Sequence, residues 1–428
     1  MRTEMLKTRI ATSRQVRCTL VAVFACIAAA LLPLHSPLAH GQTYTVLNSF
    51  NDTNGENPWG SLVLSGSTLY GMSAVGGAGN DGTIFSEPLT GGAPTVLYSF
   101  NGTNGANPAG SFIISGSTLY ATTSQGGANS YGTIFSEPLT GGTPTVLASF
   151  DGTNSGAYPH TNLILSGSTL YGMTKSGGAS GYGTIFSEPL AGGAPTVLAS
   201  FSGANGAGPY GSLILSGSTL YGMTNSGGAS GYGTIFSEPL TGGAPTVLYS
   251  FNGTNGSTPF GSLVLSGSTL YGTAWGGGIN SDGTIFSEPL TGGTPTILYS
   301  FGAAGGANGA NPLGSLTVSG STLYGTTEYG GTNGDGVVFS EPVAGGTPNV
   351  LVSFTGNDGS YPGANPGGDL LLSGSTLYGM TPYGGTNGDG VVFSDQLSTP
   401  EPASWLSFLV LAAIIGLVDW RQRRAALA

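Results

Sequence analysis

The stretch that decides the fold runs from Gly211 to Phe251 and reads GSLILSGSTLYGMTNSGGASGYGTIFSEPLTGGAPTVLYSF. It contains four short runs of apolar, β-branched or aromatic residues, SLIL, STLY, TIF and TVLYSF, and each run is ended by Gly, Ser, Pro or Asn. Strands separated by turns have this pattern. The stretch therefore predicts one four-stranded antiparallel sheet.

The stretch repeats along the chain with little change. The tyrosine of STLY recurs seven times, about every fifty residues, at Tyr70, Tyr120, Tyr171, Tyr221, Tyr271, Tyr324 and Tyr378. A single sheet cannot bury its own faces, so repeats of this length with four strands each indicate the blades of a propeller. The order STLYG, GTIFSEPL, TVLYSF is similar to the second to fourth strands of a kelch-type blade, which makes GSLILSG the first and innermost strand.

The ends of the repeat array predict how the ring closes. Six repeats are complete, whereas the seventh, from Gly368 to about Leu397, lacks its fourth strand. Residues 43–50, TYTVLNSF, read as a fourth strand with no blade before it. We therefore expect an all-β, seven-bladed β-propeller in which strand 43–50 completes the last blade, because a closed ring has no open edges. A linear solenoid or β-helix is the alternative, but it needs polar caps that the sequence does not show.

One aromatic position is predicted to pack between blades. A phenylalanine ends every fourth strand, at Phe50, Phe100, Phe150, Phe201, Phe251, Phe301 and Phe354. The apolar runs SLIL and TIF have no polar alternation, as expected of sheets that are buried on both faces.

Charge is distributed very unevenly. Of the nine basic residues in 428, eight lie near the two ends, and Lys175 is alone between them. Residues 42–397 hold seventeen of the twenty acids, since Glu4, Glu401 and Asp419 lie outside, so one base against seventeen acids leaves a net charge of −16. Such a surface repels phosphate and lacks a basic patch, which excludes nucleic acid as a partner and adsorption to anionic lipid.

The N-terminal segment, residues 1–41, is typical of a secretory signal peptide. It has a basic start, a mostly apolar run from Cys18 to Leu34, and small residues up to a plausible cleavage point after Gly41. An uncleaved anchor helix is the alternative. Both cysteines, Cys18 and Cys26, lie in this segment, so the mature chain is expected to have no disulfide and no thiol chemistry.

The C-terminal segment, residues 398–428, predicts a single transmembrane helix that serves for sorting or anchoring. The apolar run WLSFLVLAAIIGLV lies between two tryptophans and is followed by basic residues at Arg421, Arg423 and Arg424, which are expected to stay in the cytoplasm. The run is short for a span of about 17 to 25 residues.

The motif Pro400, Glu401, Pro402, followed by a hydrophobic helix and a basic end, resembles the PEP-CTERM sorting signal of Gram-negative bacteria. The resemblance implies processing by an exosortase, a membrane protease, and a final place at the cell surface or outside the cell after initial anchoring in the inner membrane. Thr399 and Asp419 depart from the commonest form of the signal. A plain C-terminal membrane anchor is the alternative.

The repeats themselves, residues 42–397, resemble the Gloeo/Verruco (GloVer) tandem repeat of bacterial surface proteins. The resemblance depends on the recurring STLYG, GG and GTIF elements and covers nearly the whole mature chain. The family has no activity that can be carried over to named residues.

Two loop positions vary while their neighbours stay constant, and the up-down strand order puts both on one face of the propeller. The first position is occupied by Trp59, Ala109, His160, Tyr210, Phe260, Leu313 and Gly367. The second is occupied by Ala74, Ser124, Lys175, Asn225, Trp275, Glu328 and Pro382. Trp59, Tyr210, Trp275 and Tyr329 are the candidate ligand-binding residues, because aromatic rings beside Asn and Asp stack on sugars. Neutral drift at exposed tips, with aromatics packed over the blade ends, is the alternative.

The acidic residues are predicted to have a structural or solubility role rather than a catalytic one. Glu87 and its equivalents form a ring at the ends of the third strands, which symmetric repetition assigns to structure or solubility rather than to a catalytic pair. Asp335 and Asp389, in the twin loops TNGDG, could ligate calcium through side-chain and carbonyl oxygens, but they lack the spacing of an established calcium loop, so no metal site is predicted. With His160 as the only histidine after the signal and no nucleophile motif near it, we predict no enzyme and no cofactor.

Together these features predict an exported, surface-associated module that binds extracellular polysaccharide or supports the cell envelope or extracellular matrix. The alternative is a glycan-processing enzyme that uses loop carboxylates.

Overall fold

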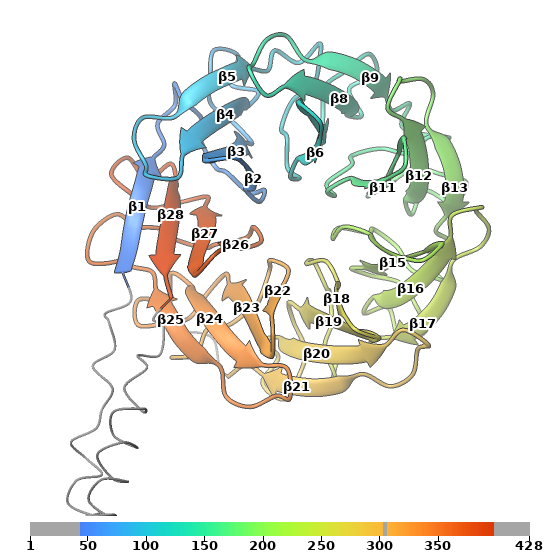
Figure 1. Ribbon diagram of the computed structural model, residues 1–428. Helices are drawn as coiled ribbons and strands as arrows, with labels where there is room; N and C mark the ends of the chain where they lie inside the picture. Colours follow the sequence, from blue (N-terminus) through green and yellow to red (C-terminus); the bar gives the residue numbers. More distant parts are fainter. Residues whose placement is uncertain (1–42, 303–305, 398–428) are drawn as a thin grey trace, which may run out of the picture. The chain divides into compact units, whose positions relative to one another are not determined.

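The computed structural model describes residues 43–302 and 306–397, and within them it confirms a closed ring of seven four-stranded antiparallel sheets (Figure 1). We number the blades 1 to 7 in chain order. The innermost strands are very short: β2 (Val63–Ser65), β6 (Ile113–Ser115), β10 (Ile164–Ser166), β14 (Ile214–Ser216), β18 (Val264–Ser266), β22 (Thr317–Ser319) and β26 (Leu371–Ser373).

The second strands of the blades are β3 (Thr68–Ser73), β7 (Thr118–Thr123), β11 (Thr169–Thr174), β15 (Thr219–Thr224), β19 (Thr269–Ala274), β23 (Thr322–Thr327) and β27 (Thr376–Thr381). The third strands are β4 (Thr83–Pro88), β8 (Thr133–Pro138), β12 (Thr184–Pro189), β16 (Thr234–Pro239), β20 (Thr284–Pro289), β24 (Val337–Pro342) and β28 (Val391–Gln396). The fourth, outermost strands are β5 (Thr95–Ser99), β9 (Thr145–Ser149), β13 (Thr196–Ser200), β17 (Thr246–Ser250), β21 (Thr296–Ser300), β25 (Asn349–Ser353) and β1 (Thr43–Ser49).

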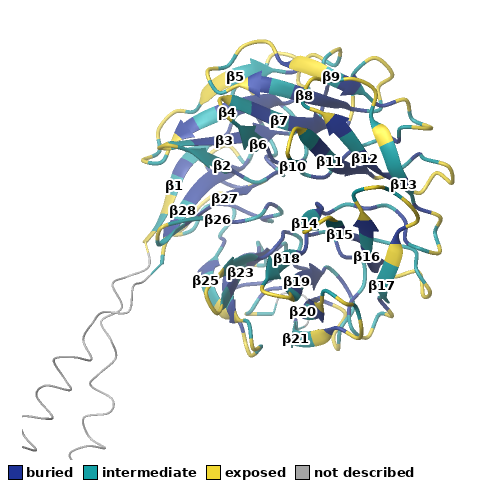
Figure 2. Cartoon of the chain, turned by 45° about the vertical axis from the view of Figure 1, so that its right-hand side comes forward, coloured by how far each residue is buried: buried dark blue, intermediate teal, exposed yellow. Residues whose placement is uncertain are grey.

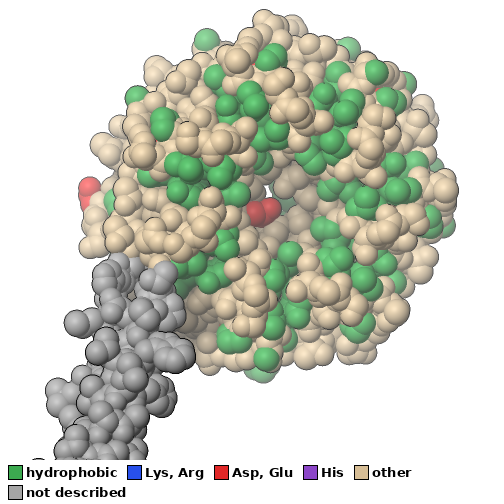
Figure 3. All heavy atoms as spheres, viewed as in Figure 1, with side chains coloured by type: hydrophobic (Ala, Val, Ile, Leu, Met, Phe, Trp, Pro, Cys, Tyr) green, Lys and Arg blue, Asp and Glu red, His purple; other side chains and the backbone are tan. Residues whose placement is uncertain are grey.

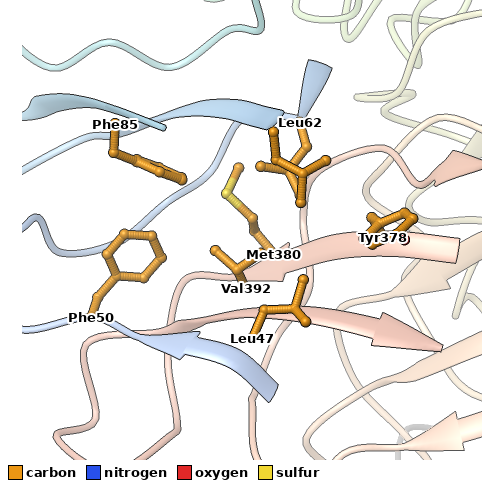
Figure 4. Packing of buried hydrophobic residues seen from close by; sticks show 8 residues of the cluster. Leu47, Phe50, Leu62, Phe85, Tyr378, Met380 and Val392 are labelled. Carbon is orange, nitrogen blue, oxygen red and sulfur yellow. The ribbon is translucent and has the colours of Figure 1, made fainter. Parts of the chain in front are cut away.

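The predicted closure is confirmed. The last blade has the strand order β1-β28-β27-β26, so the first strand of the propeller pairs with its last. Figure 1 shows β1, in blue, beside β28, in red. In this seam, Leu47 and Phe50 of the N-terminal segment join a buried cluster with Met380 and Val392 of blade 7 and with Phe85 of blade 1 (Figure 4). A linear stack is therefore wrong.

The phenylalanines that end the fourth strands pack between blades, as predicted. All seven are 0% exposed. Each meets, edge to face, the phenylalanine of the third strand in the next blade, with ring centroids 5.1 to 5.7 Å apart. Since such a pair stabilises by about 0.5–1.5 kcal/mol beyond burial, the repeated contact joins every blade to the next.

Burial explains why the middle strands lack polar alternation. The residues of TIF at the start of β16 are all buried, while β17 is exposed at Thr246 and half-buried along the rest of its length. Figure 2 shows the same gradient, with dark blue middle strands inside partly yellow outer strands and loops. A register shift at Ile235/Phe236, with its equivalents in five other blades, adds the local twist that a bulge brings.

The segments predicted as a signal peptide (1–41) and as a sorting or membrane segment (398–428) lie outside the described residues. Among residues 43–302 and 306–397, no helix is long and apolar enough to cross a membrane.

Candidate functional site

A polar belt surrounds the axis of the ring. In each blade, the residue two positions before the innermost strand donates its backbone N–H to the side-chain oxygen of the equivalent residue in the next blade. The seven members are Ser61, Ser111, Asn162, Ser212, Ser262, Ser315 and Asp369, and their N···O distances are 2.6 to 2.8 Å. The last bond, from the Asp369 N–H to Ser61 Oγ at 2.8 Å, closes the circle. The ring is therefore closed near the axis as well as at its rim.

The belt requires the backbones of neighbouring blades to approach closely. A Cβ on Gly211 would lie 2.1 Å from the carbonyl oxygen of Gly261, and one on Gly368 would lie 2.2 Å from that of Gly60. Real Cβ atoms do not come this near to a backbone oxygen, so these positions need glycine for close approach. Blade 3 has Thr161 at this position and also has the longer Asn162 in the belt.

A central cavity of about 620 Å³ lies over the belt. Six belt members line it, all but Ser111. Its other lining residues include all seven members of the first variable loop series and four members of the second, namely Ala74, Ser124, Trp275 and Glu328. Figure 3 shows the central opening of the ring, with acidic side-chain atoms in red at its middle. The positions that vary most between repeats therefore converge on one cavity.

The cavity has an aromatic wall. The rings of His160 and Tyr210 are stacked, with centroids 5.0 Å apart and planes at 12°. Tyr210 meets Phe260 edge-on at 5.1 Å, and Phe260 meets Trp275 edge-on at 6.2 Å. Trp59 lines the cavity from blade 1, and its ring meets that of Tyr383 edge to face, with the ring centroids 5.9 Å apart. All five rings of this wall are partly exposed.

Three of the four aromatic residues predicted from the sequence, Trp59, Tyr210 and Trp275, are brought together by the cavity. The fourth, Tyr329, is 40% exposed and lies beside the cavity rather than in its lining. Glu328 connects it to the site: the indole Nε1 of Trp275 donates to Glu328 Oε2 at 2.8 Å, and a hydrogen bond with Glu328 is the main cause of the raised pKa of Tyr329.

The electrostatics of the cavity come from few groups. Burial lowers the pKa of His160 to about 4, with a further contribution from the charge of Lys175, so this imidazole is neutral at physiological pH. The ammonium of Lys175 lies 5.3 Å from the centre of the Tyr210 ring. The acidic lining residues are Glu328 and Asp369. Asp369 Oδ1 already accepts the Ser315 N–H, and Glu328 already accepts the indole, so both carboxylates are held in place.

The belt was not anticipated from the sequence, although its signal is visible there. A side chain with an acceptor oxygen occurs at the same place in every repeat, directly before the leucine or phenylalanine that leads into the first strand. Because five of the seven residues are serine, the sequence alone does not distinguish this position from ordinary turn composition.

The glutamates at the ends of the third strands differ from the prediction in one respect. The predicted alternative of a role in solubility is wrong, because all of these glutamates are 0% exposed, as is Asp395 in the seventh blade. We call the glutamates of blades 1 to 6 the glutamate ring: Glu87, Glu137, Glu188, Glu238, Glu288 and Glu341. Burial raises the pKa of Glu87 to about 8 and that of each other member to about 7.

The described residues contain no group of three or more His, Cys, Asp or Glu side chains placed to hold a metal ion. Asp335 and Asp389, the loop aspartates considered for calcium, are partly buried and have raised pKa values, chiefly because of burial.

The fold defines the class of this protein: a seven-bladed β-propeller built from near-identical repeats. Comparison with protein families then gives its place within that class. The model of the Gloeobacter/Verrucomicrobia repeat matches residues 36–186 and 141–320, and the chain belongs to this family.

No curated protein matches the sequence. Among solved structures, the extracellular domain of a hybrid two-component system from B. thetaiotaomicron is similar at 12% identity and a TM-score of 0.54, over 83% of this chain and 40% of that one. An oligogalacturonate lyase in complex with manganese is similar at 13% identity and a TM-score of 0.51, over 87% of this chain and 96% of that one. These similarities show the propeller fold alone.

Proposed function

We propose that this protein is an exported, surface-associated binding module whose central cavity holds a sugar unit of an extracellular polysaccharide. One observation carries the proposal: partly exposed aromatic rings stand over a belt of hydroxyl and amide groups in a cavity of about 620 Å³. That size falls within the range of about 300–1,000 Å³ that is usual for small-ligand sites.

Sugars match such a cavity because they have two kinds of surface. The C–H face of a pyranose ring packs on an aromatic ring, and its hydroxyl edge exchanges hydrogen bonds with polar side chains. Each belt serine that accepts a backbone N–H still has its own hydroxyl proton to donate. Ser212 and Ser262 offer such protons to the cavity beneath Tyr210 and Phe260, the residues that precede them by two in the same blades.

Export is supported by the sequence at both ends. The signal-like segment 1–41 and the PEP-CTERM-like segment 398–428, with the motif at Pro400 to Pro402, would place the propeller outside the cell after exosortase cleavage. The mass of the C-terminal fragment from cells tests this: loss of the residues after Pro402 supports processing, and an intact C-terminus on the mature protein contradicts it.

Binding is tested by calorimetry of the full chain against a panel of neutral, acidic and amino oligosaccharides, with Trp275→Ala and Trp59→Ala as site variants. One stacking ring contributes about 1 kcal/mol to the binding free energy, so its loss should weaken the affinity about five-fold. Tyr232→Ala is the matched control, since Tyr232 is 46% exposed but is not among the lining residues. Equal affinities for all four proteins would contradict a site in the cavity.

The same panel separates binding from turnover. Release of shortened oligosaccharides that is lost in Glu328→Gln or Asp369→Asn would support the alternative of a glycan-processing enzyme. A protein that binds and leaves its ligand intact acts as the module proposed here.

A further inference from the structure

The charge at the floor of the cavity points to a more specific ligand class. Asp369 is the only charged member of the polar belt, where five blades have serine and one has asparagine. Only its Oδ1 takes part, by accepting the Ser315 N–H at 2.7 Å, and a serine Oγ does the same in the equivalent bonds at 2.7 to 2.8 Å. The geometry of the belt therefore does not require the negative charge of Asp369.

A second carboxylate lines the same side of the ring. Glu328 follows β23 in blade 6, and Asp369 precedes β26 in blade 7. Glu328 is fixed against the indole of Trp275 by the 2.8 Å hydrogen bond. Because an indole N–H lies in the ring plane, Glu328 stands at the edge of Trp275, where its carboxylate can attract an ammonium bound in the cavity.

The remaining charges agree with this polarity. The lining of the cavity contains no lysine or arginine within the described residues, and the neutral His160 adds no positive charge. Lys175 is exposed and follows β11 in blade 3, on the far side of the ring from β26 (Figure 1). With seventeen acids and one base between residues 42 and 397, uronates, sulfated sugars and phosphorylated sugars are repelled.

We propose that the central cavity binds an amino sugar with a free amine, with its ammonium group on the side of Glu328 and Asp369 and its pyranose ring against Trp275. This inference rests on the proposed function and narrows it from sugars in general to cationic ones.

The test compares two ligands that differ only at nitrogen. Oligomers of β-1,4-linked glucosamine and of N-acetylglucosamine, of equal length, are titrated into the full chain by calorimetry at pH 6, where the free amine is largely protonated. We expect the free-amine oligomer to bind at least ten-fold more tightly and its affinity to fall with added salt.

Asp369→Ser is the decisive variant, because it installs the residue of five other blades and should leave the belt and the melting temperature intact. It should weaken the affinity for the free-amine oligomer about ten-fold and leave the affinity for the acetylated oligomer unchanged. Glu328→Gln should act in the same direction, and the amide oxygen can still accept the Trp275 indole. Asp335→Asn removes the same unit of charge from a loop outside the cavity lining and should have little effect.

Three results overturn the inference. The first is equal binding of both oligomers with loss in Trp275→Ala; in that case the cavity is a sugar site without charge selection, and the proposed function stands. The second is an equal effect of Asp369→Ser and Asp335→Asn, which would reduce the preference to general attraction by an acidic protein. The third is no binding of either oligomer; the proposed function then also fails if the neutral and acidic oligosaccharides of the panel do not bind.

Discussion

Two rings of polar side chains run around this propeller, the polar belt with one residue in each of the seven blades and the glutamate ring with one in each of blades 1 to 6, and their environments are opposite. In the polar belt near the axis, every member accepts a hydrogen bond from the preceding blade. In the glutamate ring, the carboxylates of blades 1, 3 and 4, Glu87, Glu188 and Glu238, have no hydrogen-bond partner among the described residues. In blades 2, 5 and 6, a glycine amide of the following turn approaches the carboxylate and only moderates the rise in its pKa.

The difference shows that repetition alone does not make a polar position stabilising. Each of the six uncharged belt members adds a hydrogen bond between blades whatever the pH, because neither its side chain nor the backbone N–H that it binds ionises. A member of the glutamate ring is tolerated while it is protonated and becomes costly when it ionises, because a buried carboxylate without donors loses its hydration. One ring therefore holds the blades together, and the other makes the fold sensitive to pH.

The largest expected effect is the pH dependence of stability. The pKa of each carboxyl group in the glutamate ring rises from an ordinary 4.5 to about 7 or 8 on folding. The folded state therefore binds more protons than the unfolded state between these pH values. The stability that these carboxyl groups contribute is then fully present below pH 4.5 and is lost as the pH rises to about 8. Six groups act together, so the melting temperature should be lower by about 10 °C or more at pH 8.5 than at pH 5. A melting temperature that is constant or rises over this range in calorimetric scans would contradict the burial of these carboxylates.

The next largest effect concerns the close approach beneath the belt. Gly211→Ala places a Cβ about 2 Å from the Gly261 carbonyl oxygen, so blades 4 and 5 must move apart and stretch the belt. We expect a loss of about 3 kcal/mol in the free energy of unfolding, measured with denaturant. Gly217→Ala is the control: it lies in open space at φ +61°, and only backbone strain of about 1 kcal/mol applies. Equal losses in the two variants would show that the blades are not in tight contact.

A single member of the glutamate ring provides a smaller test with a sign that depends on pH. Glu238→Gln has the same shape and cannot ionise. Above pH 8 it should be more stable than the parent protein by up to about 3 kcal/mol, the value of a pKa raised from 4.5 to about 7. Near pH 4 the two proteins should unfold alike, since the glutamate is then protonated in both states. A variant that is less stable than the parent at pH 8.5 would mean that the carboxylate is stabilised in its ionised form.

The repeat pattern was sufficient to predict the fold because the chain repeats the same strand and turn pattern in all seven blades. The STLY and TIF runs mark the strands, and the unmatched TYTVLNSF at residues 43–50 reveals the closure. The variable loop positions also led to Trp59, Tyr210 and Trp275, since variation in an otherwise constant repeat indicates a surface free of packing constraints.

The remaining features depend on distances between blades, which one repeat does not contain. Whether Glu238 is solvated or buried is decided by the packing around the end of the third strand, and the sequence shows only a charged residue near a turn. The belt is likewise a contact between residues about fifty positions apart, such as Ser212 and Ser262. Asp369 became informative only when the structure aligned it with the serines of the other blades.

The smallest effect tests the belt itself. Ser212→Ala removes the oxygen that accepts the Asn162 N–H at 2.8 Å and leaves that donor without its partner in a narrow space between blades 3 and 4. The cost should be about 1–2 kcal/mol, and it should be the same at pH 5 and pH 8.5 because no ionisable group is involved. Ser212→Thr keeps the oxygen and is the control for loss of the acceptor. If the cost of Ser212→Ala vanished, or changed with pH as that of Glu238→Gln does, the two rings would not be independent, and the belt could not be the pH-insensitive contact that joins the blades at the axis.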